Sequence, residues 1–302
     1  MKRKMKNAIR ILIDKDFRFD IISNLGIYNS MNDEKYLKKK YKAIMHKELD
    51  LDNPKTFNEK LQWLKINDHN SDYTMMVDKY EVKNYVANII GEEHIVPTIG
   101  IYNNFEEIDF AKLPNKFVMK CTHDSGGIII CKDKLTYNKK YAKQKIKKYL
   151  KRNFYYTGRE WPYKNVKPRI IIEEFMENQG EKDLKDYKFF CFNGSPEYCQ
   201  VICDRSTNET IDFFDMNWEH QEFIGLNNNC SNSTTKLLKP YTFEKMKEFA
   251  TVLAKNTKFV RIDFYEINRK LYFGEITFYP ASGFGQFEPA IWNERLGNMI
   301  EL

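Results

Sequence analysis

The alternation of apolar and polar residues predicts two groups of β-strands along this chain. Segments such as FVMKC and FVRIDFY place unlike side chains on opposite faces, which is typical of half-buried strands. The first group comprises 95–102, 117–122 and 128–132. The second β-rich half is expected to begin at 169–175 and to continue with 188–192, 197–203, 209–215, 259–265 and 271–279, of which the three strands within 188–215 indicate an antiparallel meander.

Helical signals occupy most of residues 1–75, where strand signals are few. Thr56 is a candidate N-cap for a helix in 53–65, and Glu59 stands three residues later as the partner in a capping box. Apolar residues near a 3.6-residue period predict a helix over 77–90. Two further helices are expected at about 137–152, which is basic and amphipathic, and at about 241–256.

Strands and helices mix without regular βαβ alternation, and this favours an α+β fold over a doubly wound one. We expect a helical N-terminal region at 1–75, a first lobe at 76–168 and a second lobe at 169–302. No internal repeat and no low-complexity segment interrupts this order.

Composition agrees with a folded protein that works in the cytosol. The 302 residues are 42% hydrophobic and 15% aromatic, too apolar for a disordered chain. No apolar run approaches the roughly 20 residues that span a bilayer, and the basic N-terminal stretch lacks the apolar core of a signal peptide. The six cysteines form no CxxC pair, so we expect reduced thiols rather than disulfides or a zinc site.

The net charge of +7 is modest, and much of it lies at 36–42 and 134–152, which read as solvated helix faces. Nucleic acid is therefore not the expected partner. An acidic substrate or an anionic membrane surface stays open for either segment.

The hairpin at 117–134 suggests an anion site. Lys120 shares a strand face with Val118 and Thr122, and Gly126 and Gly127 in the following turn allow backbone N–H groups to approach an anion closely. The alternative is an ordinary hairpin whose lysine reaches solvent.

A second hairpin brings two carboxylates together. With a three-residue turn at 268–270, Asp263 faces Glu275 and Arg261 faces Thr277, and a slip of one residue would mix polar and apolar faces. Two such charges about 4 Å apart repel by about 4 kcal/mol at an effective dielectric constant near 20. A divalent cation relieves this repulsion, and hard oxygen ligands favour Mg²⁺, with Mn²⁺ as the alternative. A surface acidic pair bridged by the arginine is the competing interpretation.

The strand at 169–175 ends in a third cluster, Glu173, Glu174, Phe175 and Met176, which leads into an irregular linker. A junction of this kind suits a planar base that stacks between apolar side chains. Two exposed glutamates at a strand end are the alternative.

Together these clusters resemble the ATP-grasp superfamily, and within it the TupA-like group named for teichuronopeptide biosynthesis. The similarity runs through almost the whole chain, and it is carried by NPKTFNEKLQWLK, VDKYEVKNYV, FVMKCTHDSGG, DYKFFCFNG and VRIDFYEINRKLYFGEITFYPASGF. The resemblance implies an ATP-grasp fold in which two α+β lobes grip ATP.

The resemblance also implies a role for each matching residue. Lys79 and Lys120 would bind nucleotide phosphates, and Asp186 would bind the ribose hydroxyls. A flexible loop over the phosphates would consist of Asp124, Ser125, Gly126 and Gly127, and the adenine-reading hinge of Glu173, Glu174, Phe175 and Met176. Lys188 would face the phosphates or the acceptor, Arg261 would stabilise the reacting intermediate, and Asp263 and Glu275 would hold Mg²⁺.

One position departs from the superfamily, which usually has asparagine where this chain has Thr277. A hydroxyl is a weaker metal ligand than an amide carbonyl, so the number of metal ions, one or two, stays open.

Other residues are candidates for the substrate end. His123 beside the loop would contact the acceptor or stay a polar strand-end residue. Arg159 and Trp161, in the aromatic loop at 153–168, suit a sugar acid because aromatic faces stack on sugar rings and arginine pairs with carboxylates. Packing against the basic helix is the alternative for this loop. Ser282 and Gly283, in the segment PASGFGQFEP, are expected to border the carboxylate pocket.

The implied activity is an ATP- and Mg²⁺-dependent carboxylate–amine ligase, which would join an amino acid or small amine to a sugar acid in capsule or cell-envelope polysaccharide biosynthesis. A sugar kinase and a non-catalytic nucleotide-binding scaffold of glycan assembly are the alternatives. A glycosyltransferase is disfavoured because a convincing DxD-type metal motif is lacking. Contact with the inner face of the membrane, or with glycan-assembly enzymes, stays open.

Overall fold

A capping box starts the helix that follows Thr56 where the sequence predicts it. The computed structural model describes residues 13–227 and 229–302, so most of the basic N-terminal stretch, for which membrane contact stays open, lies outside the described residues. Thr56 and Glu59 form the predicted capping box, with each side chain bonded to the other's backbone N–H. The helices of this region are α2 (Lys15–Ser23), α3 (Asp33–Met45), α4 (Phe57–Asn67) and α5 (Asp72–Val77).

The helix expected over 77–90 is shorter than predicted. It is α6 (Glu81–Ile90), and a break separates it from α5. The break has a local cause, because the Asp78 carboxylate accepts hydrogen bonds from the backbone N–H groups of Tyr80 at 2.9 Å and Glu81 at 3.4 Å. Lys79 therefore lies in a loop, and its own N–H donates to the carbonyl of Thr122.

The first sheet has four strands in the order β1-β4-β2-β3, with all neighbours antiparallel. Its members are β1 (Thr98–Tyr102), β2 (Phe117–Cys121), β3 (Ile128–Cys131) and β4 (Ile170–Glu174). The expectation that 169–175 opens the second lobe is wrong, since β4 lies between β1 and β2 of the first sheet. β4 and the residues that directly follow it are therefore counted with the first lobe. On the side of β4 away from the cleft, Ile170 and Ile172 join the core under α7 (Lys139–Leu150).

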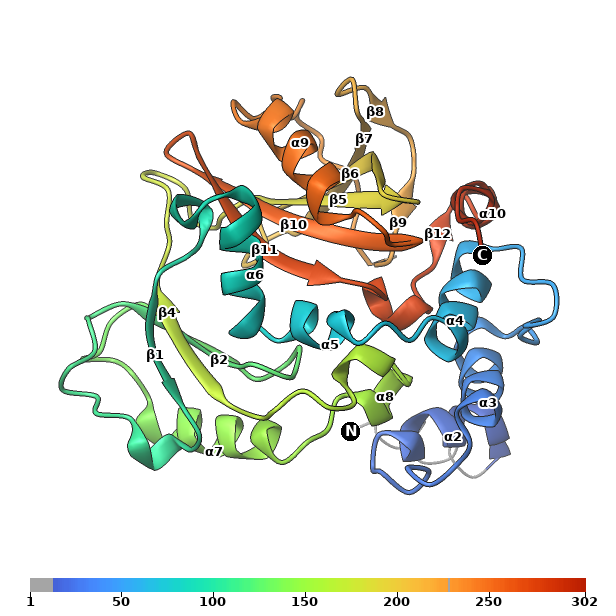
Figure 1. Cartoon of the computed structure of the whole chain (residues 1–302), viewed down its shortest axis with the longest axis horizontal. Coiled ribbons are helices and arrows are strands. Elements are labelled where there is room, and N and C mark those ends of the chain that lie inside the picture. The colour runs from blue at the N-terminus through green and yellow to red at the C-terminus, as the bar shows by residue number, and fades with distance from the viewer. Residues whose placement is uncertain (1–12, 228) are drawn as a thin grey trace.

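The second sheet has six antiparallel strands in the order β11-β10-β5-β6-β7-β8, which confirms the predicted meander. Its members are β5 (Asp186–Phe192), β6 (Ser195–Cys203), β7 (Thr210–Asp215), β8 (His220–Gln221), β10 (Phe259–Ile267) and β11 (Lys270–Thr277). Figure 1 shows α9 (Phe243–Leu253) on the outer face of this sheet. The short strands β9 (Ile224–Gly225) and β12 (Phe287–Glu288) pair separately, ahead of α10 (Ile291–Asn298).

The predicted register of the β10–β11 hairpin is confirmed next to its polar residues, where Asp263 pairs with Glu275 and Arg261 with Thr277. The predicted three-residue turn is wrong. The turn has two residues, Asn268 and Arg269, both with positive φ, and a bulge at Gly274 takes up the difference. A Cβ on Gly274 would lie only 3.0 Å from the carbonyl oxygen of Asp263, so glycine suits the bulge.

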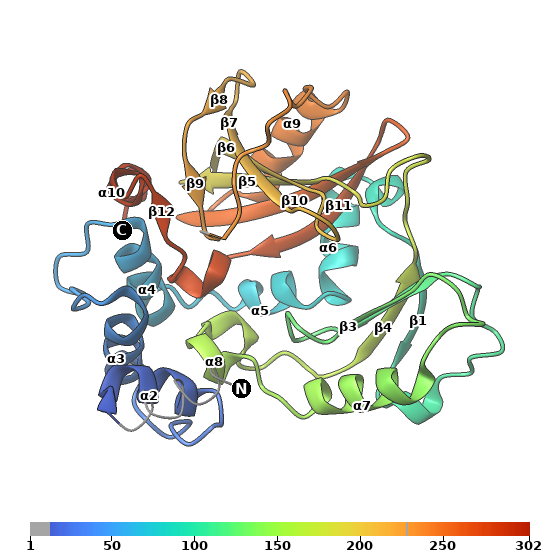
Figure 2. The ribbon, with the colours of Figure 1, turned by 180° about the vertical axis from the view of Figure 1, so that it is seen from behind.

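The two sheets face each other across α5 and α6, as the opposite views in Figures 1 and 2 show. The segment between α6 and β1 joins the first sheet to β11 of the second, through a bridge between Ile95 and Phe273 and a hydrogen bond from the His94 imidazole to the carbonyl of Leu271. All six cysteines are free, and five are buried. In the described part of the chain, no helix has the length and apolar character needed to cross a membrane.

Three side chains from α4 hold the loop that follows β11. Asn58 donates to the carbonyls of Gly283 and Gly285 at 2.9 Å, Gln62 donates to Gly283 at 2.8 Å, and the Lys65 ammonium donates to the carbonyl of Ser282 at 2.8 Å. The helical N-terminal region is thereby built into the end of the second sheet.

We expect Asn58→Ala to lower the free energy of unfolding by about 2–4 kcal/mol, because it removes the two hydrogen bonds that the Asn58 amide donates to buried carbonyls. Urea unfolding measures the effect. Asn67→Ala is the matched control, because Asn67 lies on the same helix but is exposed, and we expect a change below about 0.5 kcal/mol. Equal effects of the two substitutions would contradict this role of Asn58.

Candidate functional site

A cleft of about 630 Å³ opens between the two sheets. One part of its wall is apolar, with Val118 and Phe175 from the first lobe and Phe273 from the second, and another part carries lysines. Of the residues predicted from the sequence, ten line it: Lys79, Lys120, Ser125, Glu173, Glu174, Phe175, Met176, Asp186, Lys188 and Glu275.

On the first lobe, Glu173 binds two lysines. Its oxygens lie 2.5 Å from the ammonium of Lys83 and 2.6 Å from that of Lys120. The Glu173 side chain is only 6% exposed, whereas Glu174 is exposed. The alternative interpretation, two exposed glutamates at the strand end, therefore fails for Glu173. Burial alone would raise the pKa of Glu173, but the charges of Lys120 and Lys83 outweigh it and lower that pKa below 4.5.

On the second lobe, three neighbouring strands place a row of charges side by side. Lys188 on β5 pairs with Asp263 on β10, which pairs in turn with Glu275 on β11. The Lys188 ammonium forms an ion pair with Oδ2 of Asp263 and lies 3.4 Å from Oδ1 of Asp186. The row faces the cleft, with Lys188 and Glu275 among the lining residues and Asp263 beneath them.

Arg261 completes this cluster from the side. Its guanidinium donates to both oxygens of Asp263, at 2.6 and 2.7 Å, and to Oε1 of Glu275 at 3.0 Å. The same group donates to the Thr277 hydroxyl at 3.1 Å. The arginine therefore offsets the repulsion between the two carboxylates, as one interpretation of the sequence required.

Glu275 is the open end of the cluster, since its side chain is 42% exposed. Burial of the remainder acts to raise its pKa, but the surrounding cations, led by Lys79 and Lys188, lower the pKa to about 2. This carboxylate is therefore ionised at neutral pH and faces the cleft lysines.

A family model described as TupA-like ATPgrasp matches residues 59–301, a range that includes every residue of the cleft cluster. The chain belongs to the TupA-like ATP-grasp family. The two-lobed ATP-grasp fold that the resemblance implies is thereby confirmed. A search of curated proteins finds no match.

Solved structures of ATP-grasp ligases are similar to this chain at low identity. The D-alanine–D-alanine ligase from Bacillus anthracis complexed with ATP is 14% identical over 75% of this chain and 63% of its own, with a TM-score of 0.42. The L-amino acid ligase from Bacillus licheniformis is 11% identical over 75% of this chain and 49% of its own, with a TM-score of 0.41. This chain thus spans less than two thirds of either ligase.

Of the two carboxylates predicted to bind a divalent cation, only Glu275 has an oxygen available. Glu275 offers a carboxylate toward the cleft, which is the hard oxygen donor that Mg²⁺ prefers. Both oxygens of Asp263 are instead bound by Arg261 and Lys188. Among the described residues, no three acidic, histidine or cysteine side chains gather as a metal site. Asp263, Glu275 and Thr277 as metal ligands stay a prediction.

Asp186, the predicted ribose residue, lines the cleft but is already paired. Its Oδ2 accepts from the Nε of Arg205 at 2.7 Å, and Lys188 approaches its other oxygen. Arg205 follows β6 and also lines the cleft. Any contact of Asp186 with ribose would have to share its carboxylate with Arg205.

The predicted phosphate loop contributes only Ser125 to the cleft lining. Asp124 is fully buried and accepts a hydrogen bond from the N–H of Gly126 at 2.6 Å, and both glycines pack close to Tyr149 of α7. His123 points the same way, with its Nε2 2.9 Å from the carbonyl of Arg152, and burial lowers its pKa. In this arrangement the turn packs on α7, and Ser125 is its one contribution to the cleft lining.

The substrate residues expected in the aromatic loop lie elsewhere. Arg159 is 2% exposed, and its guanidinium donates to the carbonyls of Tyr28, Asn29 and Met31, so its assignment to a substrate carboxylate is wrong. Trp161 stacks on His69 at 4.8 Å. Both side chains thus pack on residues of the N-terminal helical region, and not on the basic helix that was the alternative for this loop.

Ser282 and Gly283 also lie outside the residues that line the cleft, because α4 binds their carbonyls. As a border of a carboxylate pocket they stay a prediction.

The sequence interpretation missed many of the lining residues, among them Lys83, Tyr163 and Arg205. Lys83 follows Lys79 by four residues, and the Asp78 cap is the signal that places Lys79 in a loop and Lys83 on a helix. Nothing in the local pattern marks Tyr163, which ends the short 3-10 helix Trp161–Tyr163, or Arg205, which lies in the turn after β6.

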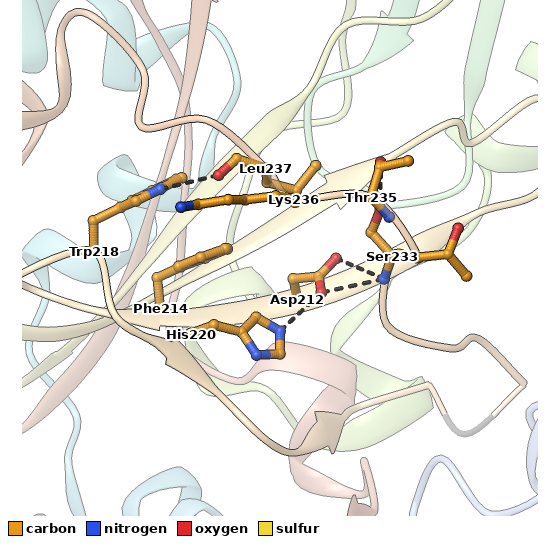
Figure 3. Close-up of a pocket in the computed structure, with 9 residues that line it drawn as sticks. Asp212, Phe214, Trp218, His220, Ser233, Thr235, Lys236 and Leu237 are labelled. Atoms are coloured by element: carbon orange, nitrogen blue, oxygen red, sulfur yellow. Dashed lines mark hydrogen bonds and ion pairs between the residues drawn. The ribbon is translucent and has the colours of Figure 1, made fainter.

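A second pocket of about 410 Å³ lies at β7 and β8, away from the cleft (Figure 3). Its buried Asp212 accepts from the N–H of Ser233 and contacts His220, and Trp218 stacks on Phe214. These contacts anchor the segment after β9 against β7.

We expect Glu173→Gln to destabilise the protein by about 3 kcal/mol at pH 7, because it leaves two lysines without their shared carboxylate. Since the folded-state pKa of Glu173 lies below 4.5, its contribution is present above that pH and is lost as the pH falls through the folded pKa. The difference between the two proteins should therefore shrink below pH 4.5.

Urea unfolding at several pH values measures this difference. Glu174→Gln is the matched control, because Glu174 is the exposed neighbour, and we expect a change within about 0.5 kcal/mol. A pH-independent loss in Glu173→Gln would contradict the role of the ion pairs.

Proposed function

We propose that this protein is an ATP- and Mg²⁺-dependent carboxylate–amine ligase. ATP would transfer its γ-phosphoryl group to a carboxylate, giving ADP and an acylphosphate. An amine would then attack the acyl carbon, form the amide and release phosphate. Such transfer needs positioning and charge neutralisation rather than a protein nucleophile.

The observation that carries the proposal is the convergence of cations from distant segments on one cleft. Lys79, Lys120 and Lys188 line it together with the ionised Glu275, although more than 100 residues separate the first lysine from the last. Lysine ammonium groups at one cleft suit a polyphosphate, since each presents a compact charge on a flexible stem.

The apolar wall suits the base of the nucleotide. Phe175 and Met176 follow β4 at the junction of the lobes, and Ile95, Val118 and Ile276 lie in the same lining. A planar ring buried among such side chains gains apolar contact, and backbone groups of the junction would fix its orientation.

The chain's own residues would divide the remaining work. Lys79 and Lys120 would bind phosphate oxygens, and Lys188 would contact the phosphates or the acceptor. Arg261 holds Asp263 and Glu275 in place through three hydrogen bonds and would act toward the reacting intermediate from there. Mg²⁺ bound at these carboxylates would neutralise phosphate charge.

For the substrates, we propose a sugar acid as the carboxylate and an amino acid or small amine as the acceptor, in capsule or envelope polysaccharide biosynthesis. The support is the resemblance to the TupA-like group and its name. A cytosolic site of action, at or near the membrane, belongs to the same proposal.

The test supplies ATP and Mg²⁺ with sugar acids and amines, and measures ADP, free phosphate and product mass. We expect phosphate release only when both substrates are present. Phosphate retained on the sugar would indicate a kinase instead, and nucleotide binding without turnover would indicate a scaffold.

We expect Lys120→Met to weaken binding of a non-hydrolysable ATP analogue by about 10- to 100-fold, the value of one charge-assisted hydrogen bond. Calorimetry measures the affinity. Lys112→Met is the matched control, because Lys112 is 85% exposed and is not among the lining residues, and its affinity should match the wild type. Unchanged binding by Lys120→Met would remove Lys120 from the nucleotide site.

A further inference from the structure

The Asp263 carboxylate has no free oxygen in this arrangement. Its side chain is 2% exposed, Arg261 donates to both oxygens, and the Lys188 ammonium binds Oδ2 from the neighbouring strand. Lys188 is itself only 7% exposed on its side chain. The predicted metal ligand is therefore already neutralised by two side chains of the protein.

A divalent cation and the Lys188 ammonium would compete for the same oxygen. Mg²⁺ needs a free lone pair on an oxygen at about 2.0–2.1 Å, and Lys188 and Arg261 already occupy both acceptor positions of Oδ2. The two cations would also repel each other by several kcal/mol at the effective dielectric constant of a protein site. Lys188 must leave Asp263 before that oxygen can coordinate a metal.

The charged side chains around Asp263 do not favour metal binding either. Around this row, Lys188, Arg205 and Arg261 balance Asp186, Asp263 and Glu275. Over the whole lining of the cleft, seven lysine and arginine side chains meet seven carboxylates, so the charges of the lining balance. The described cleft thus offers a free divalent cation little net attraction.

Departure of Lys188 has a cost that depends on what else the cleft holds. A buried ammonium without a partner is unfavourable, and Asp186 is already bound by Arg205. Lys188 lines the cleft on a flexible stem, so a polyphosphate would give it a new anionic partner within reach.

We propose that Lys188 is an internal counter-ion that keeps divalent cations off Asp263 until a nucleotide's phosphates accept the lysine. This inference rests on the proposed function. Lys188 is then a positioning residue that couples metal binding to nucleotide binding, and by linkage each ligand raises the affinity for the other. Free Mg²⁺ in the cell, without nucleotide, would leave Asp263 bound to Lys188 and Arg261.

The test measures binding of Mn²⁺ alone to the full chain, without nucleotide, by electron paramagnetic resonance. We expect wild-type protein to bind Mn²⁺ weakly, and Lys188→Met to bind it at least 10-fold more tightly because Asp263 is released. Lys188→Arg keeps the charge and should stay weak. Adding Asp263→Asn to Lys188→Met should remove the gain.

Lys185→Met is the matched control. Lys185 lies three residues away, pairs with Glu181 at 3.0 Å, and is not among the residues that line the cleft. Its removal changes the net charge equally, so we expect its Mn²⁺ affinity to match the wild type. An equal gain in Lys185→Met and Lys188→Met would overturn the proposal, because only overall charge would then matter.

Two further results would overturn it. One is tight Mn²⁺ binding by the wild type without nucleotide, a measurement that holds even if the Lys188 variants do not fold. The other is a folded Lys188→Met with wild-type Mn²⁺ affinity. Neither result touches the proposed ligase, which fails separately if the wild type neither binds the ATP analogue nor releases phosphate.

Discussion

A carboxylate buried in the middle of a sheet must be paired, and Asp263 imposes that constraint on its neighbours. Arg261 lies two residues away on β10, and Lys188 lies directly opposite on β5, so both partners come from the same or the adjacent strand. A shift of one residue between β5 and β10 would leave the charge without its lysine and turn apolar side chains toward the cleft. The register of β5 against β10 is therefore coupled to this ion pair.

The first lobe also pairs its buried carboxylate, Glu173, with two cations, Lys83 and Lys120. There two lysines share one buried glutamate, which leaves one positive charge in excess toward the cleft. The second lobe is balanced within itself. An anionic ligand would be drawn to the first wall and would disturb the balance of the second. The cleft is thus prepared for a ligand that carries its own negative charge.

Sequence patterns predicted what depends on neighbours along the chain or on face alternation. The capping box at Thr56 and the pairing of Asp263 with Glu275 are such cases. Patterns failed where three-dimensional packing decides. The alternation along β11 does not reveal the bulge at Gly274. An arginine such as Arg159 gives the same sequence pattern whether it faces a cleft or the carbonyls of a distant loop. The position of β4 inside the first sheet likewise follows from pairing and not from chain order.

The N-terminal helices also help to position the strand that carries Glu275. Three side chains of α4 bind carbonyls of the loop after β11, in which Ala281 and Ser282 both have positive φ. Residues other than glycine adopt that conformation only when their surroundings hold them there. The helical region therefore fixes the exit of β11 and, through it, the direction of the hairpin on which Asp263 and Glu275 lie. Residues remote from the cleft in sequence thereby help to set the geometry of its charged floor.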